Sequence, residues 1–311
     1  MLEDFAIGRI TPIGRDVKHF ELIPVGSGVA PRPHAPGAHV VVETPVRVNS
    51  YSLTGDGVRP DSYAISVRRV GEHGGSAWLH DVATVGDRVG VSPPMSFFAP
   101  VPTARHHLLI AAGIGVTPIL SHARAARRWG RSFTVIYGHA KDRSPHRDEL
   151  AALTTAFTDV VGRAALTAAI NGALRAQPVG THLYACGPAP LLHAIIDRAA
   201  AHGWPRARLH VESFGTPDGG SGSAFTVHVA NRGLLVNVPA GVSALHALDE
   251  VGLRVPRLCE RGVCGQCRVH VTAGTPDHRD LILSAHERAV DNRFYPCVSR
   301  ALTPELEVTI P

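Results

Sequence analysis

Four cysteines in the last sixth of the chain have a spacing that few folds can use. Cys259, Cys264 and Cys267 are separated by four and then two residues, and Cys297 follows further along. This three-plus-one arrangement is the plant-type ligand pattern for a two-iron, two-sulfur cluster, in which each iron takes two thiolates besides the bridging sulfides. The pattern predicts a 2Fe-2S cluster held by one tight loop and one distant cysteine.

The residues between the cysteines suit such a loop. Gly262 and Gly265 accept positive φ and let backbone N–H groups approach the sulfides. Three flanking arginines would offset part of the cluster's negative charge: Arg257, Arg261 and Arg268.

Two other uses of four cysteines compete with the cluster. A structural zinc ion is the main alternative, but zinc sites usually pair two short C-x2-4-C knuckles. Disulfides belong to oxidising compartments, and the chain shows no export signal, because its N-terminus MLEDFAIGRI carries acids where a signal peptide carries basic residues.

Length and composition set further bounds. A chain of 311 residues can form two or three domains, and its 44% apolar and 18% charged residues are typical of globular proteins. The longest apolar run, Leu108 to Leu120, is too short to span a bilayer. The net charge of +5 would suit an acidic protein partner, but no basic run with interleaved aromatics points to nucleic acid. We expect a soluble, cytoplasmic monomer without a membrane partner.

Residues 1–102 are predicted to be rich in β-strands. Short runs of apolar and β-branched residues, punctuated by Gly and Pro, indicate an antiparallel sandwich or barrel: Val40–Glu43, Tyr63–Val67 and Arg88–Val91. Further on, Gly74–Ser76 looks like a glycine-rich turn entering a helix, where backbone amides and the Ser76 hydroxyl could bind an anion. An ordinary helix N-cap is the alternative there.

Residues 103–214 alternate apolar strands with helical stretches. This alternation predicts a parallel, doubly wound α/β sheet with its ligand site at the carboxyl ends of the strands. The expected strands are His107–Ala112, Phe133–Tyr137 and Thr181–Cys186. The expected helices run from the end of the turn Gly113–Pro118 through Trp129, from Asp148 to Phe157 and from Ala189 to Ala201.

The turn Gly113–Pro118 occupies the position at which a pyrophosphate would lie on a helix N-terminus. It lacks the full three-glycine dinucleotide fingerprint, so a plain strand-to-helix turn stays open as an alternative.

The segment 215–223 consists almost wholly of Gly, Ser, Pro and Asp and is predicted to be a flexible linker, or else a passive boundary loop. Beyond it, residues 224–311 are expected to form an α+β domain. A hairpin of Phe225–Val229 and Leu234–Val238, followed by a helix from Ala244 to Val251, would lead to the cysteine loop.

This order of segments resembles the phthalate dioxygenase reductase family, including vanillate demethylase reductases, over nearly the whole chain. The resemblance implies a flavin-binding β-barrel, a nicotinamide-binding domain and a plant-type ferredoxin domain of the β-grasp type. It also implies a function: an NADH-dependent reductase that passes electrons through FMN and the 2Fe-2S cluster to a separate Rieske-type oxygenase.

The resemblance also assigns residues. The segment Tyr51–Leu53 would line the isoalloxazine, Ser50 would also bind the cofactor, and Gly74, Gly75 and Ser76 would hold the FMN phosphate. The nicotinamide nucleotide would lie along two turns: Gly113, Gly115, Thr117 and Pro118, and Cys186, Gly187 and Pro188. Thr117 and Cys186 would lie near the nicotinamide, and Glu212 and Phe214 in the segment that returns to the flavin. Ser52 is our own candidate for a hydrogen bond near flavin N5. A small buried thiol and a half-buried strand aromatic are the alternatives for Cys186 and Tyr51.

The chain departs from the family pattern in two places. Asn49 stands where the family's flavin motif usually has an arginine, and Arg47 lies two residues earlier on the same strand face. Asp142 follows Lys141 where many relatives have Arg-Ser, and an acidic side chain near the adenine ribose favours NADH over NADPH. Lys141 and Arg143 adjoin it and could act in the opposite sense.

The implied chemistry needs a converter between two-electron and one-electron steps. NADH gives up two electrons together as a hydride, whereas the cluster accepts one, and a flavin can mediate between them. Two alternatives remain: a reductase that feeds a different one-electron acceptor, and a non-catalytic redox-sensing or electron-carrying module.

Overall fold

The computed structural model describes residues 2–26, 30–214 and 222–311. The chain divides into two compact units, Met1–Pro188 with His202–Glu212, and Ala189–Ala201 with Ser213–Pro311. Of the predicted linker 215–223, residues 215–221 lie outside the described part. None of the helices within the described ranges combines the length and apolar character needed to cross a membrane.

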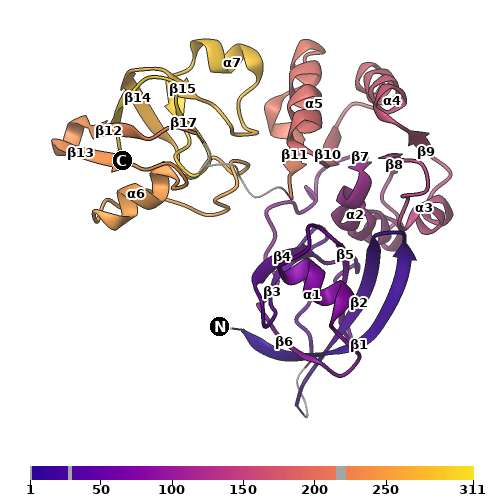
Figure 1. Cartoon of the computed structure of the whole chain (residues 1–311). Helices are drawn as coiled ribbons and strands as arrows, with labels where there is room; N and C mark the ends of the chain where they lie inside the picture. Colours follow the sequence, from indigo (N-terminus) through magenta and orange to yellow (C-terminus); the bar gives the residue numbers. More distant parts are fainter. Residues whose placement is uncertain (1, 27–29, 215–221) are drawn as a thin grey trace. The chain divides into compact units, whose positions relative to one another are not determined.

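The first part of the first unit is a six-stranded antiparallel sheet with the order β4-β3-β6-β1-β2-β5 (Figure 1). Its strands are β1 (Glu3–Gly14), β2 (Val17–Pro24), β3 (His39–Glu43), β4 (Val48–Ser52), β5 (Tyr63–Arg68) and β6 (Arg88–Val91). A bridge between Leu53 and Ile65, with a hydrogen bond of 2.9 Å from Thr54 N to Ala64 O, joins the ends of the order. The sheet therefore closes on itself, which confirms the predicted barrel.

The barrel core follows from the period-two pattern of its strands. Phe20 and Leu22 of β2, and Tyr63 and Ile65 of β5, point inward and are almost fully buried. The short helix α1 (Gly75–Asp81) adds Leu79 to the same core. This packing holds the entry to α1 against the barrel.

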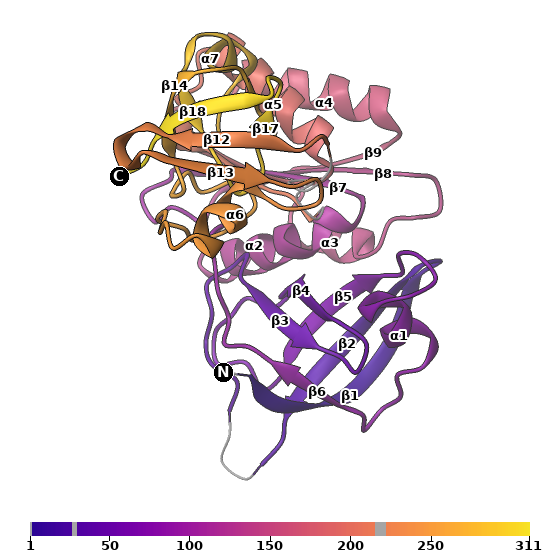
Figure 2. The same cartoon turned by 60° about the vertical axis from the view of Figure 1, so that its left-hand side comes forward.

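The rest of the first unit contains a five-stranded parallel sheet with the order β11-β10-β7-β8-β9. Its strands are β7 (His106–Ala112), β8 (Phe133–His139), β9 (Phe157–Val161), β10 (Thr181–Cys186) and β11 (Leu209–Glu212). Helices α2 (Val116–Arg128) and α3 (Arg147–Leu153) lie side by side (Figure 2). Helix α4 (Arg163–Arg175) lies on the opposite face of the sheet from α2 and α3 (Figure 2). Its Leu166 side chain packs against Gly138 of β8. The predicted parallel doubly wound arrangement is confirmed.

The sequence prediction was wrong between residues 154 and 175. The helix expected to run to Phe157 ends at Leu153, and Phe157 instead begins β9. Three β-branched residues of that strand, Thr158, Val160 and Val161, pair with β8, and this tertiary pairing outweighs local helix preference. The prediction also missed α4, whereas α5 (Ala189–Ala201) occurs where it was expected. A short 3-10 helix, η2 (Arg206–Arg208), precedes β11.

The second unit contains a five-stranded mixed sheet with the order β13-β12-β18-β14-β16. Figure 2 shows β12 and β13 side by side, with β18 next to β12. The strands are β12 (Phe225–Val229), β13 (Leu234–Val238), β14 (Val269–Ala273), β16 (Arg293–Phe294) and β18 (Glu305–Thr309), beside a two-stranded ladder of β15 (Pro276–Asp277) and β17 (Arg300–Ala301). The predicted hairpin is present, with η3 (Ala230–Arg232) at its turn, and the helices are α6 (Ala244–Glu250) and α7 (Ala285–Val290). The α+β prediction is confirmed.

Candidate functional site

The four predicted cysteine ligands come together as two pairs. The sulfurs of Cys267 and Cys297 are 3.3 Å apart, and the thiol of Cys264 lies against that of Cys259. None of the cysteines in the described ranges forms a disulfide. A two-iron cluster needs two thiolates on each iron, so the pairing fits that group.

The loop that carries three of these ligands depends on unusual backbone conformations. Gly262 and Gly265 have φ values of 67° and 76°, as the sequence predicted, and Glu260 also lies in the left-handed region with φ 51°. A Cβ on Gly262 would lie 2.6 Å from a methyl carbon of Val298. The amide of Arg261 donates to Cys259 Sγ at 3.4 Å. The loop therefore aims backbone N–H groups at sulfur, as cluster loops require.

Part of the positive charge near the loop is already paired with carboxylates, so only the rest can offset the charge of a cluster. Arg257 forms ion pairs with Asp249 at 3.1 Å and with Glu260 at 3.5 Å. Its charge is thus shared with two carboxylates rather than directed at the sulfurs alone.

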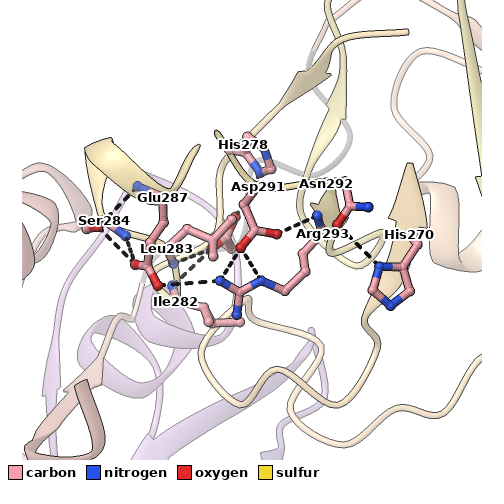
Figure 3. A network of polar contacts seen from close by, with 10 residues as sticks. His270, His278, Ile282, Leu283, Ser284, Glu287, Asp291, Asn292 and Arg293 are labelled. Atoms are coloured by element: carbon pink, nitrogen blue, oxygen red, sulfur yellow. Dashed lines mark hydrogen bonds and ion pairs between the residues drawn. The ribbon is translucent and has the colours of Figure 1, made fainter. Parts of the chain in front are cut away.

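A polar network supports the segment that returns Cys297 to the loop. The Ser284 hydroxyl and the Glu287 carboxylate form a capping box at the start of α7. Figure 3 shows the guanidinium of Arg293 reaching both Glu287 and Asp291. The amide of Leu281 donates to Gly262 O at 2.8 Å, which ties this segment to the cysteine loop.

The predicted flavin strand leaves two buried oxygen atoms unsatisfied. Asn49 Oδ1 and Ser52 Oγ are both buried and have no hydrogen-bond partner in the part of the chain that the structure describes. Burying a polar atom without a partner costs about 1–3 kcal/mol, so we expect a water or ligand atom to complete the hydrogen bonding of each oxygen. The residues of β4 therefore fit a polar ligand at the positions assigned to the flavin.

Asn49 also joins the two segments assigned to the flavin. A Cβ on Gly75 would overlap Asn49 Oδ1 and would lie 3.5 Å from Arg47 O. Asn49, at the position where the resemblance led us to expect an arginine, thus lies beside the first residue of α1. Only glycine permits this approach of strand and helix.

The glycine-rich turn offers backbone amides more than side chains. Gly74 has φ 112° with open space around its Cα, and the first amides of α1 have no intrahelical acceptor. The Ser76 hydroxyl is engaged: it accepts from Val70 N and donates to Val70 O, both at 3.2 Å. Ser76 therefore holds the turn itself, and the amides remain to meet an anion.

The other strand residues are placed as follows. Tyr51 packs on the barrel core, and burial raises the pKa of its phenol to about 12. Ser50 is half-buried, and Leu53 is fully buried in the barrel core. Tyr51 is thus neutral at ordinary pH, as a half-buried strand aromatic would also be.

The two predicted nucleotide turns meet at Gly115. A Cβ on this glycine would overlap Cys186 O and lie 2.6 Å from Cys186 C, so the turn after β7 touches the turn after β10. Gly113 has φ 56° and open space around it. Thr117 is buried and its hydroxyl donates to Ile114 O at 3.1 Å. Pro118 lies in the first turn of α2, where its missing N–H costs nothing.

Cys186 and Glu212 are direct neighbours in the parallel sheet. The Cys186 thiol is 1% exposed and belongs to the core that includes Tyr184. Burial, and then the nearby Glu212 carboxylate, raise the pKa of this thiol well above its ordinary value. Cys186 thus has the surroundings of a core thiol, while its backbone lines the turn at Gly187, whose amide donates to Glu212 O at 3.4 Å. Pro188 ends the first unit, and Phe214 belongs to the second.

Asp142 occupies a tight turn after β8 with φ 60°. The amide of Arg143 donates to Ala140 O at 3.1 Å, and the Arg143 side chain pairs with Asp16 at 3.6 Å. Asp142 and Lys141 are exposed beside it.

Sequence analysis missed two polar residues of α2. Ser121 and Arg124 follow Thr117 at spacings of four and seven residues, which places all three on one helix face. That spacing was the available signal, but nothing in the sequence indicates which barrel carbonyls these side chains bind.

A barrel joined to a parallel nucleotide-type sheet, together with paired cysteines on a ferredoxin-type sheet, defines a class of iron–sulfur flavin reductases. Residues 88–209 match the family described as dimethylamine monooxygenase subunit DmmA-like, N-terminal domain. Residues 227–302 match the 2Fe-2S iron-sulfur cluster binding domain.

Whole-length relatives agree. The chain is 36% identical over 302 residues to the heme-dependent oxidative N-demethylase beta subunit of Ectopseudomonas mendocina (strain ymp), covering 95% of this chain and 94% of the relative. It is 32% identical over 303 residues to the phthalate 4,5-dioxygenase oxygenase reductase subunit of Pseudomonas putida, covering 94% and 91%. The solved structure of phthalate dioxygenase reductase superposes with a TM-score of 0.68 at 31% identity, covering 99% of this chain and 98% of that one.

The chain belongs to the phthalate dioxygenase reductase-like family. It is an oxidoreductase, the reductase of an oxygenase system that carries electrons from a pyridine nucleotide through a flavin to a 2Fe-2S cluster. The sequence-based prediction of function is confirmed at this level, and the alternative of a non-catalytic module is set aside.

Proposed function

We propose that this reductase uses NADH and FMN, and that it delivers single electrons to a separate Rieske-type oxygenase. The observation that carries the proposal is the two-by-two pairing of the cysteine sulfurs, in a chain whose other unit joins a β-barrel to a parallel nucleotide-type sheet. The phthalate dioxygenase reductase subunit among the relatives supports an oxygenase partner.

The flavin-binding residues are proposed from β4 and the start of α1. Asn49, with Arg47 nearby, and the amides of Gly75 and Ser76 would hold a terminal phosphate. This compact arrangement supports FMN rather than a longer dinucleotide. Ser52 Oγ, buried and without a partner among the described residues, would donate to the ring near N5. When bound, the flavin would supply the change from two-electron to one-electron chemistry.

The nicotinamide nucleotide is proposed to lie where the turns at Gly115 and Cys186 touch. Thr117 would line the site beside the nicotinamide, and Glu212 would lie on the flavin side. Asp142 would accept hydrogen bonds from the adenine ribose, and the Arg143–Asp16 pair supports NADH because it draws that cation toward the barrel.

The domain boundaries follow the same proposal: 1–102 for the flavin, 103–214 for the nucleotide, 215–223 as linker and 224–311 for the cluster. The two sheets of the first unit and the separate sheet of the second support this division, whereas the compact units differ from it by placing α5 (Ala189–Ala201) in the second unit. We also propose a monomer that works in the cytoplasm, where the cluster thiolates are kept reduced.

An anaerobic visible spectrum before and after NADH tests the cofactors. Flavin and cluster bands that bleach on addition of NADH, with FMN released on denaturation, are expected. A colourless protein that stays so after reconstitution with FMN, iron and sulfide would overturn the assignment. NADPH bleaching as fast as NADH would overturn the role of Asp142.

A haem-containing oxygenase is a second candidate acceptor. The relative named as a heme-dependent oxidative N-demethylase beta subunit favours it. Electron delivery to one purified Rieske oxygenase and one haem demethylase, each supplied with its own substrate, separates the two candidates. Coupled product formation with the Rieske component alone is expected.

A further inference from the structure

Helix α2 presents a polar stripe along one side. Thr117, Ser121, Arg124 and Arg128 recur at helical spacing and therefore share a face. Thr117 belongs to the proposed nicotinamide turn, whereas the other three contact the connection between β4 and β5. The stripe thus spans the distance between the two proposed sites of the first unit.

Ser121 is the first contact below Thr117. Its side chain is fully buried, and its hydroxyl donates to Gly55 O at 2.5 Å. The same oxygen accepts from Gly37 N at 3.2 Å. One hydroxyl thereby joins α2 to two separate barrel segments.

Arg124 makes the second contact. One terminal nitrogen donates to Thr54 O at 2.8 Å, and Nε donates to Glu149 Oε1 at 2.6 Å. Burial opposes the charge on Glu149, but hydrogen bonds from His146 and Arg124 lower its pKa to about 2. A permanent anion therefore holds the guanidinium in the orientation that reaches Thr54.

The carbonyls that α2 binds come directly after the proposed flavin residues. Thr54 follows Ser52 and Leu53, is fully buried, and has its own amide bonded to Ala64 O at 2.9 Å. Its neighbourhood is thus fixed on one side by the barrel and on the other by α2. Displacing this connection would move Ser52 relative to Thr117.

We propose that Ser121 and Arg124 are positioning residues for hydride transfer. They act by locking the strand end that carries Ser52 to the helix that begins at the nicotinamide turn. The inference rests on the proposed use of flavin and NADH by this unit. A misplacement of about 1 Å between reacting groups can cost on the order of 100-fold in rate.

Transient kinetics on the full chain test the proposal. For Arg124→Ala we expect the flavin reduction rate at saturating NADH to fall roughly 10- to 100-fold, with the Kd for NADH changed by less than about 2-fold. Arg124→Lys should recover part of the rate, because one ammonium cannot reproduce both arms of the guanidinium. Arg128→Ala is the matched control: this arginine of the same stripe is about half exposed and binds the half-buried Asp56 side chain at 2.9 Å rather than a barrel carbonyl, so its rate should match wild type.

A second measurement does not depend on the loaded enzyme. In the cofactor-free chain, hydrogen exchange of the Leu53 and Thr54 amides, which donate to Ala38 O and Ala64 O, should speed up at least 10-fold in Arg124→Ala and not in Arg128→Ala, with the thermal midpoint preserved. A wild-type reduction rate in Arg124→Ala, or equal losses in both variants, overturns the positioning role. If wild type is not reduced by NADH, the proposed function fails, and the exchange result still decides whether the contact exists.

Discussion

Two regions of the molecule hold chemical groups at fixed distances in opposite ways. One is the cysteine loop, and the other is the α2–barrel junction, formed by the contacts of Ser121 and Arg124 with the barrel. Three of the four proposed cysteine ligands lie within nine consecutive residues, shaped by glycines with positive φ. The junction instead joins residues 66 and 70 positions apart, Ser121 to Gly55 and Arg124 to Thr54. The loop is defined by local sequence, whereas the junction exists only once two sheets have formed and met.

The comparison predicts that the two regions fail separately. Cys297→Ala removes one thiolate from the Cys267 pair, so we expect complete loss of the cluster, because an iron with one protein ligand is not retained. Flavin reduction by NADH should continue at its wild-type rate, while electron transfer to cytochrome c should stop. Iron analysis and stopped-flow absorbance measure these effects. Cys186→Ala should keep its iron, and iron retained in Cys297→Ala would contradict the ligand assignment.

The same contrast explains what could be predicted from the sequence. The cysteine ligands, Gly262 and Gly265, the strand Thr181–Cys186 and the helix Ala189–Ala201 follow local rules of spacing, alternation and turn chemistry. β9 was missed because its strand state depends on pairing with β8.

The role of Ser76 shows the same limit at a single residue. Its hydroxyl was expected to meet an anion, but it binds the Val70 backbone, a contact set by the path of the turn. Ser121 and Arg124 were missed because their acceptors are backbone carbonyls, which every residue has.

Mild acid should destabilise the first unit before it affects the second. Burial lowers the pKa of His122 to about 3 and those of His107 and His210 to about 4, so these rings are neutral in the folded first unit. Unfolding lets them bind protons below about pH 6.5, and stability therefore falls as the pH drops from about 6.5 toward 4. At pH 5 His122 alone accounts for about 2 kcal/mol.

The second unit should respond at lower pH. Arg293 lowers the pKa of Asp291, so the stability from this pair is present above the ordinary carboxyl range and is lost only as the pH falls below it. All three tryptophans, Trp78, Trp129 and Trp204, lie in the first unit, so their fluorescence reports its unfolding, and cluster absorbance reports the second. A urea midpoint that falls at pH 5 by both probes equally would contradict the prediction.

Gly115→Ala should damage the first unit while sparing the second. The new Cβ would overlap the Cys186 carbonyl, which is backbone and cannot rotate away. Overpacking of this kind costs roughly 1–3 kcal/mol and would force the two nucleotide turns apart. We expect a lower thermal midpoint by tryptophan fluorescence and weaker NADH binding, with unchanged cluster absorbance. Gly172→Ala, in α4 with open space around it, is the control and should be neutral or slightly stabilising. Full NADH affinity in Gly115→Ala would show that the turns can separate without consequence.

Ser52→Ala should change stability and rate the least of these variants, but the two changes should have opposite signs. In the cofactor-free chain its buried hydroxyl has no partner among the described residues, so its removal should stabilise the first unit by about 1 kcal/mol. With flavin bound, the same change removes the proposed donor near N5, and flavin reduction by NADH should slow by roughly 10-fold while the flavin stays bound. A purely structural serine would not give opposite signs in the two states. Paired urea titrations of the cofactor-free chain and stopped-flow reduction of the loaded chain measure both. If the apoprotein is destabilised, or the reduction rate is unchanged, then Ser52 stabilises the barrel and does not act on the flavin. In that case the strand end that Arg124 holds in place could affect flavin reduction only through its backbone.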